Sequence, residues 1–209
     1  MKKLLLVCAL FLAVPALFAQ GYSPLYEYGL FRDTTRVELY GGMVLPRDGW
    51  RDRSSDTDFG KMGWSAGIGF QRNLVNWFSL GLDANYAQLG DTDKASDKSY
   101  YRTGIATGLV TGRISFFTSR PTRLYIPFGA GIGHTFARHQ KADHSHETVS
   151  GTDWAHMVGL GLEFDMDESM IFGLEGRMYR VTTRDDFKAT FNKDHIYSLD
   201  LMLKLGFRF

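Results

Sequence analysis

Histidine and acidic residues that could bind a metal are concentrated in one short stretch of the chain. Within nine residues the sequence contains His139, Asp143, His144, His146 and Glu147. Imidazole and carboxylate groups are ligands for zinc and copper. However, the stretch is polar and has no evident rigid support, and metal sites need ligands that are held in orientation. We interpret it as a solvated loop with His139, His144 and His146 as weak metal-ligand candidates, and we predict no cofactor.

Two Ser–His combinations could serve nucleophilic chemistry. His144 directly precedes Ser145, and His195 lies three residues before Ser198. Neither serine lies in a Gly-Xaa-Ser-Xaa-Gly elbow, and no phosphate-binding Walker loop occurs. We interpret His195 as a polar residue at the edge of a strand, and the sequence predicts no catalytic residues.

The carboxy-terminal segment indicates which elements position these residues. Every odd position from Tyr197 to Phe209 is aromatic or Leu, and the positions between them are mostly polar or small. This period of two predicts a strand with two unlike faces. A strand with one long apolar face needs a broad apolar partner. A bilayer supplies one to a tilted strand of about 9 to 11 residues.

The same alternation occurs seven more times, and long connections alternate with short ones. The predicted strands are Arg36–Leu45, Met62–Gln71, Phe78–Leu89, Arg102–Phe116, Leu124–Ala137, Trp154–Asp165, Met170–Val181 and a last one from Ile196. After the first 19 residues there is no apolar run long enough for a membrane-spanning helix. The sequence therefore predicts an all-β fold: an eight-stranded antiparallel transmembrane barrel with up-and-down connections, short periplasmic turns and four long extracellular loops.

The amino terminus supports export from the cytoplasm. Lys2 and Lys3 precede the apolar run 4–18 and the small residue Ala19, which predicts a cleaved signal peptide. We expect three regions: a signal peptide over 1–19, a short periplasmic segment over 20–34 and the barrel over 35–209. Cys8 lies in the signal, so thiol chemistry is excluded after cleavage. The 24 basic and 23 acidic residues nearly cancel, which argues against nucleic acid as a partner.

Glycine placement predicts which face of the strands points inward. Eight glycines lie at the alternate strand positions that also carry the polar side chains: Gly67, Gly69, Gly81, Gly129, Gly131, Gly133, Gly159 and Gly161. A narrow barrel interior demands small residues, so we expect these positions to point inward. The aromatic residues that alternate with these polar positions should point toward lipid and form two interfacial girdles. Near the long loops these are Trp64, Tyr86, Phe136, Trp154 and Tyr197. Near the short turns they are Phe78, Phe116, Phe164, Phe172 and Phe207. On the fourth strand the apolar residues change face: Ile105 and Leu109 lie at odd positions, whereas Ile114 and Phe116 lie at even ones. An extra residue in the strand would explain the change, so we expect a bulge near Gly112 and Arg113.

Charged residues of the inward parity predict a polar network inside the barrel. The candidates are Glu38, Glu163, Glu175, Arg177, Asp200, Lys204 and Arg208. Buried charges persist only when they are paired, so we expect ion pairs of Glu38 or Glu175 with Arg177 or Lys204. A filled lumen is the preferred interpretation. A narrow pore through the same groups and a catalytic pair of carboxylates remain alternatives.

These features give the chain a family resemblance. Residues 37–42, Val-Glu-Leu-Tyr-Gly-Gly, residues 127–133, Pro-Phe-Gly-Ala-Gly-Ile-Gly, and the terminal Phe209 resemble eight-stranded outer-membrane barrels of the OmpA/OmpX and opacity-protein type. The resemblance implies that Phe207 and Phe209 act as an assembly signal read by the barrel-assembly machinery. It also implies a range of roles: structural anchors, adhesins, small pores and lipid-modifying enzymes. No peptidoglycan-binding domain is expected after Phe209.

The predicted loops combine charges with aromatic residues, which are frequent binding anchors. The candidates are Trp50, Arg51, Arg53, Tyr100, Tyr101 and Phe187. They could bind host or matrix ligands, or equally contact lipopolysaccharide headgroups. We therefore expect a monomeric, non-enzymatic protein of the cell outer membrane with a structural or adhesin-like role. Its partners would be outer-membrane lipid and lipopolysaccharide, and the alternatives are a small passive porin and a lipid-modifying enzyme.

Overall fold

The computed structural model describes residues 34–46, 61–90, 100–116, 122–140, 146–183 and 194–209. The predicted signal peptide and nearly all of the segment 20–34 lie outside these residues. Eight strands account for most of the described chain: β1 (Thr35–Pro46), β2 (Lys61–Val75), β3 (Phe78–Gly90), β4 (Tyr100–Phe116), β5 (Thr122–Gln140), β6 (His146–Asp165), β7 (Met170–Thr182) and β8 (His195–Arg208). No helix among the described residues has the length and apolar character needed to span a membrane.

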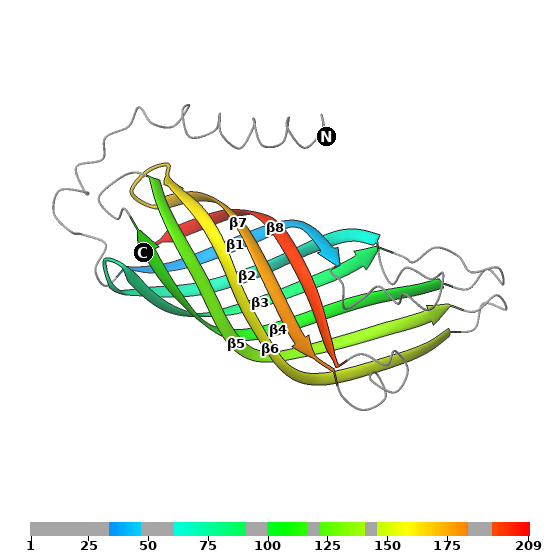
Figure 1. Cartoon of the computed structure of the whole chain (residues 1–209). Coiled ribbons are helices and arrows are strands. Elements are labelled where there is room, and N and C mark those ends of the chain that lie inside the picture. Colours follow the sequence, from blue (N-terminus) through cyan, green and yellow to red (C-terminus); the bar gives the residue numbers. More distant parts are fainter. Residues whose placement is uncertain (1–33, 47–60, 91–99, 117–121, 141–145, 184–193) are drawn as a thin grey trace.

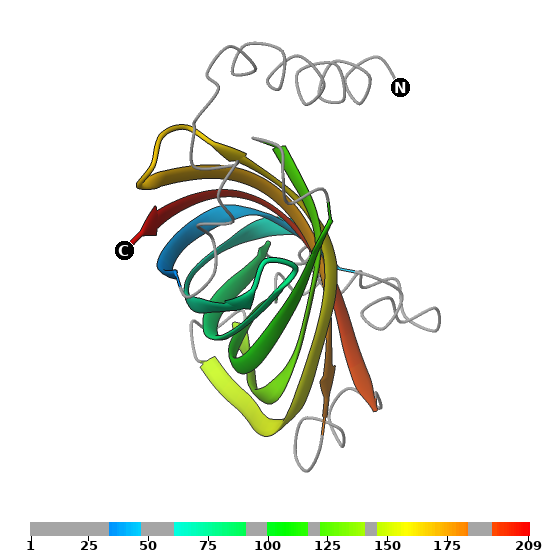
Figure 2. The same cartoon turned by 90° about the vertical axis from the view of Figure 1, so that its left-hand side faces the viewer.

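The strands form a closed barrel in chain order, and every neighbouring pair is antiparallel (Figures 1 and 2). Closure comes from the pairing of β1 with β8, which runs from Arg36 opposite Arg208 to Pro46 opposite Ser198. The predicted eight-stranded antiparallel barrel is confirmed. The largest difference lies in β6, which begins at His146 and not at Trp154, because its ladder with β5 continues as far as Gln140 opposite His146.

The apolar face of the strands points outward. On β8, Leu201, Leu203 and Leu205 are exposed, whereas Met202 and Lys204 between them are buried. Successive side chains of a strand point to opposite sides of the sheet, so the alternation separates a lipid-facing wall from a lumen. All eight glycines predicted to face the interior lie on the lumen parity of their strands.

The bulge predicted near Gly112 and Arg113 is wrong. The register of β4 with β3 and with β5 continues unbroken through both residues. Ile105 and Leu109 have the parity of Arg113 and are each 3% exposed, because they point into the lumen and not toward lipid. The apolar residues of β4 therefore change from the inward to the outward face because the lumen is itself apolar at one end. The irregular registers occur instead at both ends of the β2–β3 pair.

Aromatic residues mark the outer wall near the long loops. The ring centroids of Trp64 and Tyr86 are 5.5 Å apart, and those of Tyr86 and Phe136 are 6.2 Å apart, so one row of rings crosses β2 to β5. Trp154 continues the girdle on β6 with 59% of its surface exposed. Near the short turns Phe164 differs from the expectation. It is only 3% exposed and its ring stacks on Phe172.

The short turn between β6 and β7 is organised by Asp167. Its carboxylate accepts hydrogen bonds from the backbone N–H groups of Ser169 and Met170, both at 2.7 Å, and from the Ser169 hydroxyl at 2.9 Å. These bonds lower the pKa of Asp167, and the backbone N–H of Ser169 contributes most. The side chain thereby adds to the backbone bonds of the turn, in which the Met166 and Asp167 N–H groups donate to the Met170 carbonyl oxygen.

Candidate functional site

The lumen holds a network of paired charges, which we call the lumen charge network. It consists of six cations, Arg36, Arg113, Arg123, Arg177, Lys204 and Arg208, and six carboxylates, Glu38, Asp83, Glu163, Asp165, Glu175 and Asp200. All lie on inward positions of β1 and β3–β8. The formal charges among these described residues cancel, as burial in a narrow interior requires.

Arg113 is the centre of the half nearest the short turns. One of its nitrogens lies 2.9 Å from Glu38 Oε1, and another contacts Glu163. Arg36 closes the group, with Nε 3.0 Å from Glu38 Oε1 and Nη1 3.1 Å from Glu163 Oε2. The four side chains come from β1, β4 and β6, so these ion pairs cross the barrel. They link three strands of the wall at this height.

Lys204 links this group to the next one along the axis. Its Nζ lies 2.7 Å from Glu38 Oε2 and 2.8 Å from Glu175 Oε2. Glu175 also accepts a hydrogen bond of 2.5 Å from the Tyr125 hydroxyl and contacts the guanidinium of Arg177. Glu38 and Glu175 are each bound by at least two cationic side chains. Both acids therefore have their charge neutralised and their lone pairs occupied.

The middle of the lumen is built around Asp83. Arg177 Nη1 lies 2.9 Å from Asp83 Oδ2, and the Tyr40 hydroxyl donates to Oδ1 at 2.7 Å. The guanidinium of Arg177 also lies over the Tyr40 ring, 4.4 Å from its centroid. Asp200 is held differently, by hydrogen bonds from Ser198 at 3.2 Å and Asn85 at 3.4 Å. Nearer the short turns, Asp165 binds both Arg208, at 2.8 Å, and Arg123.

Glycines on the facing wall make room for the two network tyrosines. A Cβ at Gly161 would overlap the ring of Tyr125, and one at Gly67 would overlap the Tyr40 hydroxyl. The tyrosines therefore lie against strands that present no side chain at the point of contact. Long polar side chains can in this way occupy an eight-stranded interior without leaving a channel.

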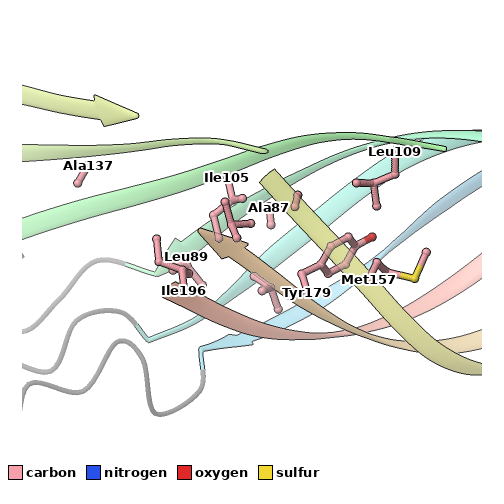
Figure 3. Close-up of a cluster of buried hydrophobic side chains, with 11 residues drawn as sticks. Ala87, Leu89, Ile105, Leu109, Ala137, Met157, Tyr179 and Ile196 are labelled. Atoms are coloured by element: carbon pink, nitrogen blue, oxygen red, sulfur yellow. The ribbon is translucent and has the colours of Figure 1, made fainter. Parts of the chain in front are cut away.

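Toward the long loops the lumen becomes apolar. A cluster of buried side chains fills it: Val44, Ala87, Leu89, Ile105, Leu109, Ala137, Ala155, Met157, Tyr179, Val181 and Ile196 (Figure 3). Most come from the halves of their strands nearest the long loops, and Leu109 and Met157 lie near the middle of theirs. The lumen thus contains two layers of different chemistry, ion pairs and tyrosines nearer the short turns and mainly aliphatic packing nearer the long loops.

The predicted lumen residues fall at different places in this arrangement. Glu38, Glu163, Glu175, Arg177 and Lys204 are brought together. Asp200 is buried beside them, and Arg208 lies at the rim nearest the short turns. The prediction missed further members, Arg36, Asp83, Arg113, Arg123 and Tyr125. All except Arg113 lie an even number of residues from a predicted member or an inward glycine on the same strand, so strict alternation could have found them.

Several predicted residues cannot be assessed. Trp50, Arg51, Arg53, His144 and Phe187 lie outside the described residues. The backbones of Tyr100, Tyr101, His139 and His146 belong to strands, but their side chains are not described. No group of three or more metal-ligating side chains occurs in the described part of the chain. Phe207 and Phe209 are both exposed on the outer wall, and the Phe209 backbone exchanges hydrogen bonds with Thr35 on β1.

His195 and Ser198 do not form a pair. His195 has outward parity, and its Nε2 lies 2.8 Å from Arg180 Nη2, whereas Ser198 has inward parity and donates to Asp200. The wall of the barrel separates them. A cavity of about 210 Å³ opens on the outer side of β5–β8, and its lining consists mainly of leucines, Leu124, Leu160, Leu162, Leu174 and Leu201. Its one charged lining residue, Glu175, is bound within the lumen charge network.

Solved structures with this architecture come from several bacteria. Ail of Yersinia pestis, solved with the heparin analogue sucrose octasulfate, is 16% identical in sequence and has a TM-score of 0.51. The match covers 85% of this chain and 99% of the Ail chain. Neisserial surface protein A is 14% identical, with a TM-score of 0.51 and coverage of 84% and 96%. A major outer membrane protein of Thermus thermophilus is 11% identical, with a TM-score of 0.55 and coverage of 84% and 98%.

At these identities the structures establish a shared fold only, and no curated protein sequence matches the chain. The family assignment comes from the sequence model of the outer membrane protein beta-barrel domain, which matches residues 4–209. That span includes all eight strands and both layers of the filled lumen. The chain therefore belongs to the outer membrane protein beta-barrel domain family and is a protein of the bacterial outer membrane.

Proposed function

We propose that the protein is a non-enzymatic, non-conducting barrel that acts as a structural and surface-interaction protein of the outer membrane. The observation that carries this proposal is the burial of large side chains at two heights of the lumen. Arg113 and Arg177 are among its largest fully buried side chains, and Tyr179, from the apolar cluster, is 2% exposed. A passive pore would need a continuous polar path past all three.

Ion passage through this lumen is unfavourable for two separate reasons. The ion pairs of the lumen charge network would have to open, and an uncompensated buried charge costs several kcal/mol. A hydrated ion would then have to enter the aliphatic cluster around Leu89 and Ile105, where no polar group replaces its water shell. The arrangement favours a plug over a selectivity filter.

The surface role is supported by strands that extend beyond the others. β5 and β6 contain 19 and 20 residues, against 12 in β1 and 13 in β7. Because about 9 to 11 residues span the bilayer, β4–β6 form a wall that projects on the long-loop side (Figure 1). Its ladder is paired as far as Tyr100 opposite Gln140. Ail, of similar fold, was crystallised with a sulfated sugar, and we infer that this wall likewise presents a surface for host or matrix ligands.

A lipid-modifying activity has less support. His195 and Ser198 lie on opposite faces of the wall, and the leucine-lined cavity offers no nucleophile. Five of the six network acids are bound by cations, and Asp200 is held by hydrogen bonds from Ser198 and Asn85, which disfavours a role as general base.

Conductance measurements test the closed lumen. The full mature protein, refolded and checked by heat-dependent gel mobility, is expected to be silent in a planar lipid bilayer. A double variant, Leu89→Ala with Ile105→Ala, removes bulk from the apolar cluster only. It should remain silent because the lumen charge network still closes the barrel. Stable steps from the wild-type protein would contradict the proposal and favour the porin alternative.

The surface role needs a separate experiment. Cells that display the wild-type barrel should bind immobilised matrix glycans or proteins, and replacing residues 139–147 by a two-residue turn should abolish binding without affecting surface display. A matched variant that scrambles only residues 141–145 separates ligand contacts made by the loop from those made by the strands. Retained binding after the shortening would refute a role for the projecting wall.

A further inference from the structure

Charge is sorted between the two faces of the described strands. Every carboxylate within them lies on the inward parity: Glu38, Asp83, Glu147, Asp153, Glu163, Asp165, Glu175 and Asp200. The outward parity instead carries basic and imidazole side chains. Those described are Arg72, Arg102, His134, Arg138, His156, Arg180 and His195. All except Arg72 lie in the half of the barrel nearest the long loops.

Three of the outward residues converge on β6, β7 and β8, and we call them the outer-wall basic site: His156, Arg180 and His195. His156 lies directly opposite Arg180 in the β6–β7 ladder. Arg180 Nη2 lies 2.8 Å from His195 Nε2, and the His195 ring meets the Tyr197 ring edge-on, with centroids 6.4 Å apart. The long-loop ends of β7 and β8 lie side by side and pair with the middle of β6, which continues beyond them (Figure 1).

The height of this site matches the lipid headgroups. His156 follows the girdle residue Trp154, and Arg180 is the cross-strand neighbour of Tyr197. Aromatic girdles lie at the interface between the hydrocarbon core and the headgroups. One step further into the membrane the outward residues are aliphatic, namely Val158, Met178 and Leu199. The basic site is therefore a polar layer directly above an apolar wall.

The site presents hydrogen-bond donors to the outside of the barrel. Among the described strand residues, no acid points outward to neutralise the positive charge of the site. A guanidinium can only donate, so His195 Nε2 accepts from Arg180 when its ring is neutral. Asp153 and Asp194 are the nearest acids in sequence. Asp153 has inward parity and bonds the Trp154 N–H, and Asp194 precedes β8 and engages Thr183 through its backbone. A phosphate oxygen is the natural partner for an arginine flanked by imidazoles.

An apolar cavity lies on the same strands toward the membrane centre. It is the cavity lined by Leu160, Leu162, Leu174 and Leu201, where Gly176 leaves space in the wall. Gly176 lies four residues from Arg180 along β7 and Leu160 four residues from His156 along β6, which is roughly 13 Å in each strand. A headgroup at the basic site would therefore place an acyl chain over the cavity.

We propose that the outer-wall basic site binds the phosphate of a phosphorylated lipid in the outer leaflet, with an acyl chain of the same molecule in the leucine-lined cavity below. The pairing of an anion site with an apolar cavity at bilayer depth selects a lipid over a soluble anion. The site faces outward and lies below the part of β6 that projects, so it can be tested separately from the proposed surface role.

Lipid retention by the full mature protein in a zwitterionic detergent tests the proposal. Diphosphorylated lipid A is titrated in and the bound fraction is read by native mass spectrometry, with dephosphorylated lipid A as the comparison. Arg180→Gln should weaken binding roughly tenfold to a hundredfold, as expected for loss of a charge-assisted contact. Gly176→Leu, which fills the cavity, should also weaken it.

Arg72→Gln is the matched control, because it removes one outward arginine at the opposite end of the barrel. It should leave binding of diphosphorylated lipid A unchanged. Heat-dependent gel mobility confirms that each variant is folded. Equal binding of the dephosphorylated lipid, or an equal loss in Arg72→Gln, would overturn the proposal. Full displacement by excess inorganic phosphate, with Gly176→Leu unaffected, would show a free-anion site and would overturn the lipid assignment.

Discussion

The guanidinium carbon of Arg113 lies 4.1 Å from the centroid of the Tyr125 ring, and Lys204 Nζ lies 5.0 Å from the same centroid. One aromatic ring is thus shared by two of the three cations that hold Glu38. Cation–π contacts of this kind strengthen when water is excluded, as it is around these two buried cations. Tyr125 also donates to Glu175, so a single side chain joins the two halves of the lumen charge network.

Replacing Arg113 by Met should be strongly destabilising. The change leaves Glu38 and Glu163 short of one partner each, and breaking a buried ion pair costs about 3 to 5 kcal/mol. The free energy of unfolding, measured by denaturant titration in lipid vesicles with tryptophan fluorescence, should fall by that amount. Arg72→Met, an exposed outward position, should change it by no more than about 0.5 kcal/mol. Similar losses in both variants would argue against a specific role for the network.

Adding a methyl group at Gly161 should disturb the network through Tyr125. The new Cβ would overlap the Tyr125 ring, and overpacking of this kind costs about 1 to 3 kcal/mol. Gly108→Ala is the matched control, because nothing lies within 4 Å of a Cβ at that position. In a Tyr125→Ala background Gly161→Ala should lose most of its cost, so the two changes should be non-additive in the free energy of unfolding. Additivity would contradict the close contact.

A charge on the lipid-facing wall should have an effect that depends on depth. Leu203 has 54% of its surface exposed at the middle of β8, and an arginine there should cost about 2 to 4 kcal/mol of unfolding free energy. Leu203→Phe should be nearly neutral by the same measurement. If arginine were tolerated at Leu203 as well as phenylalanine, the assignment of this face to the bilayer would be wrong.

The Asp167 turn should contribute a stability that depends on pH. Because its pKa is lowered in the folded protein, the unfolded chain binds the proton more strongly, and acidification favours unfolding. The contribution is therefore fully present above the ordinary Asp pKa of about 3.9 and is lost as the pH falls through the lowered folded value. The difference in unfolding free energy between wild type and Asp167→Ala should be constant near neutral pH and should shrink in acid. A difference that grows in acid would contradict the assignment.

Strand positions and barrel closure could be predicted because alternation is a local property of the sequence. The members of the lumen charge network were harder to find. Arg113 was missed because Ile105 and Leu109 were assigned to the lipid face, which placed Arg113 at a supposed bulge. Burial of the three residues on one continuous face shows that inward positions can be apolar at one height and charged at another. Which acid meets which base depends on contacts across the barrel, such as Arg36 with Glu163, 127 residues apart, and these leave no local pattern.

The long sequence separation of these ion pairs has a consequence for assembly. Lys204 on β8 meets Glu38 on β1 only after the first and last strands have paired, and Arg36 meets Glu163 only when the sheet has curled fully. An open intermediate therefore carries several unmatched charges on the face that will become the interior. The final pairing neutralises them together, which makes ring closure an all-or-none event. A barrel of this design resists reopening at its seam, and it discourages release into the bilayer before the last strand is in register.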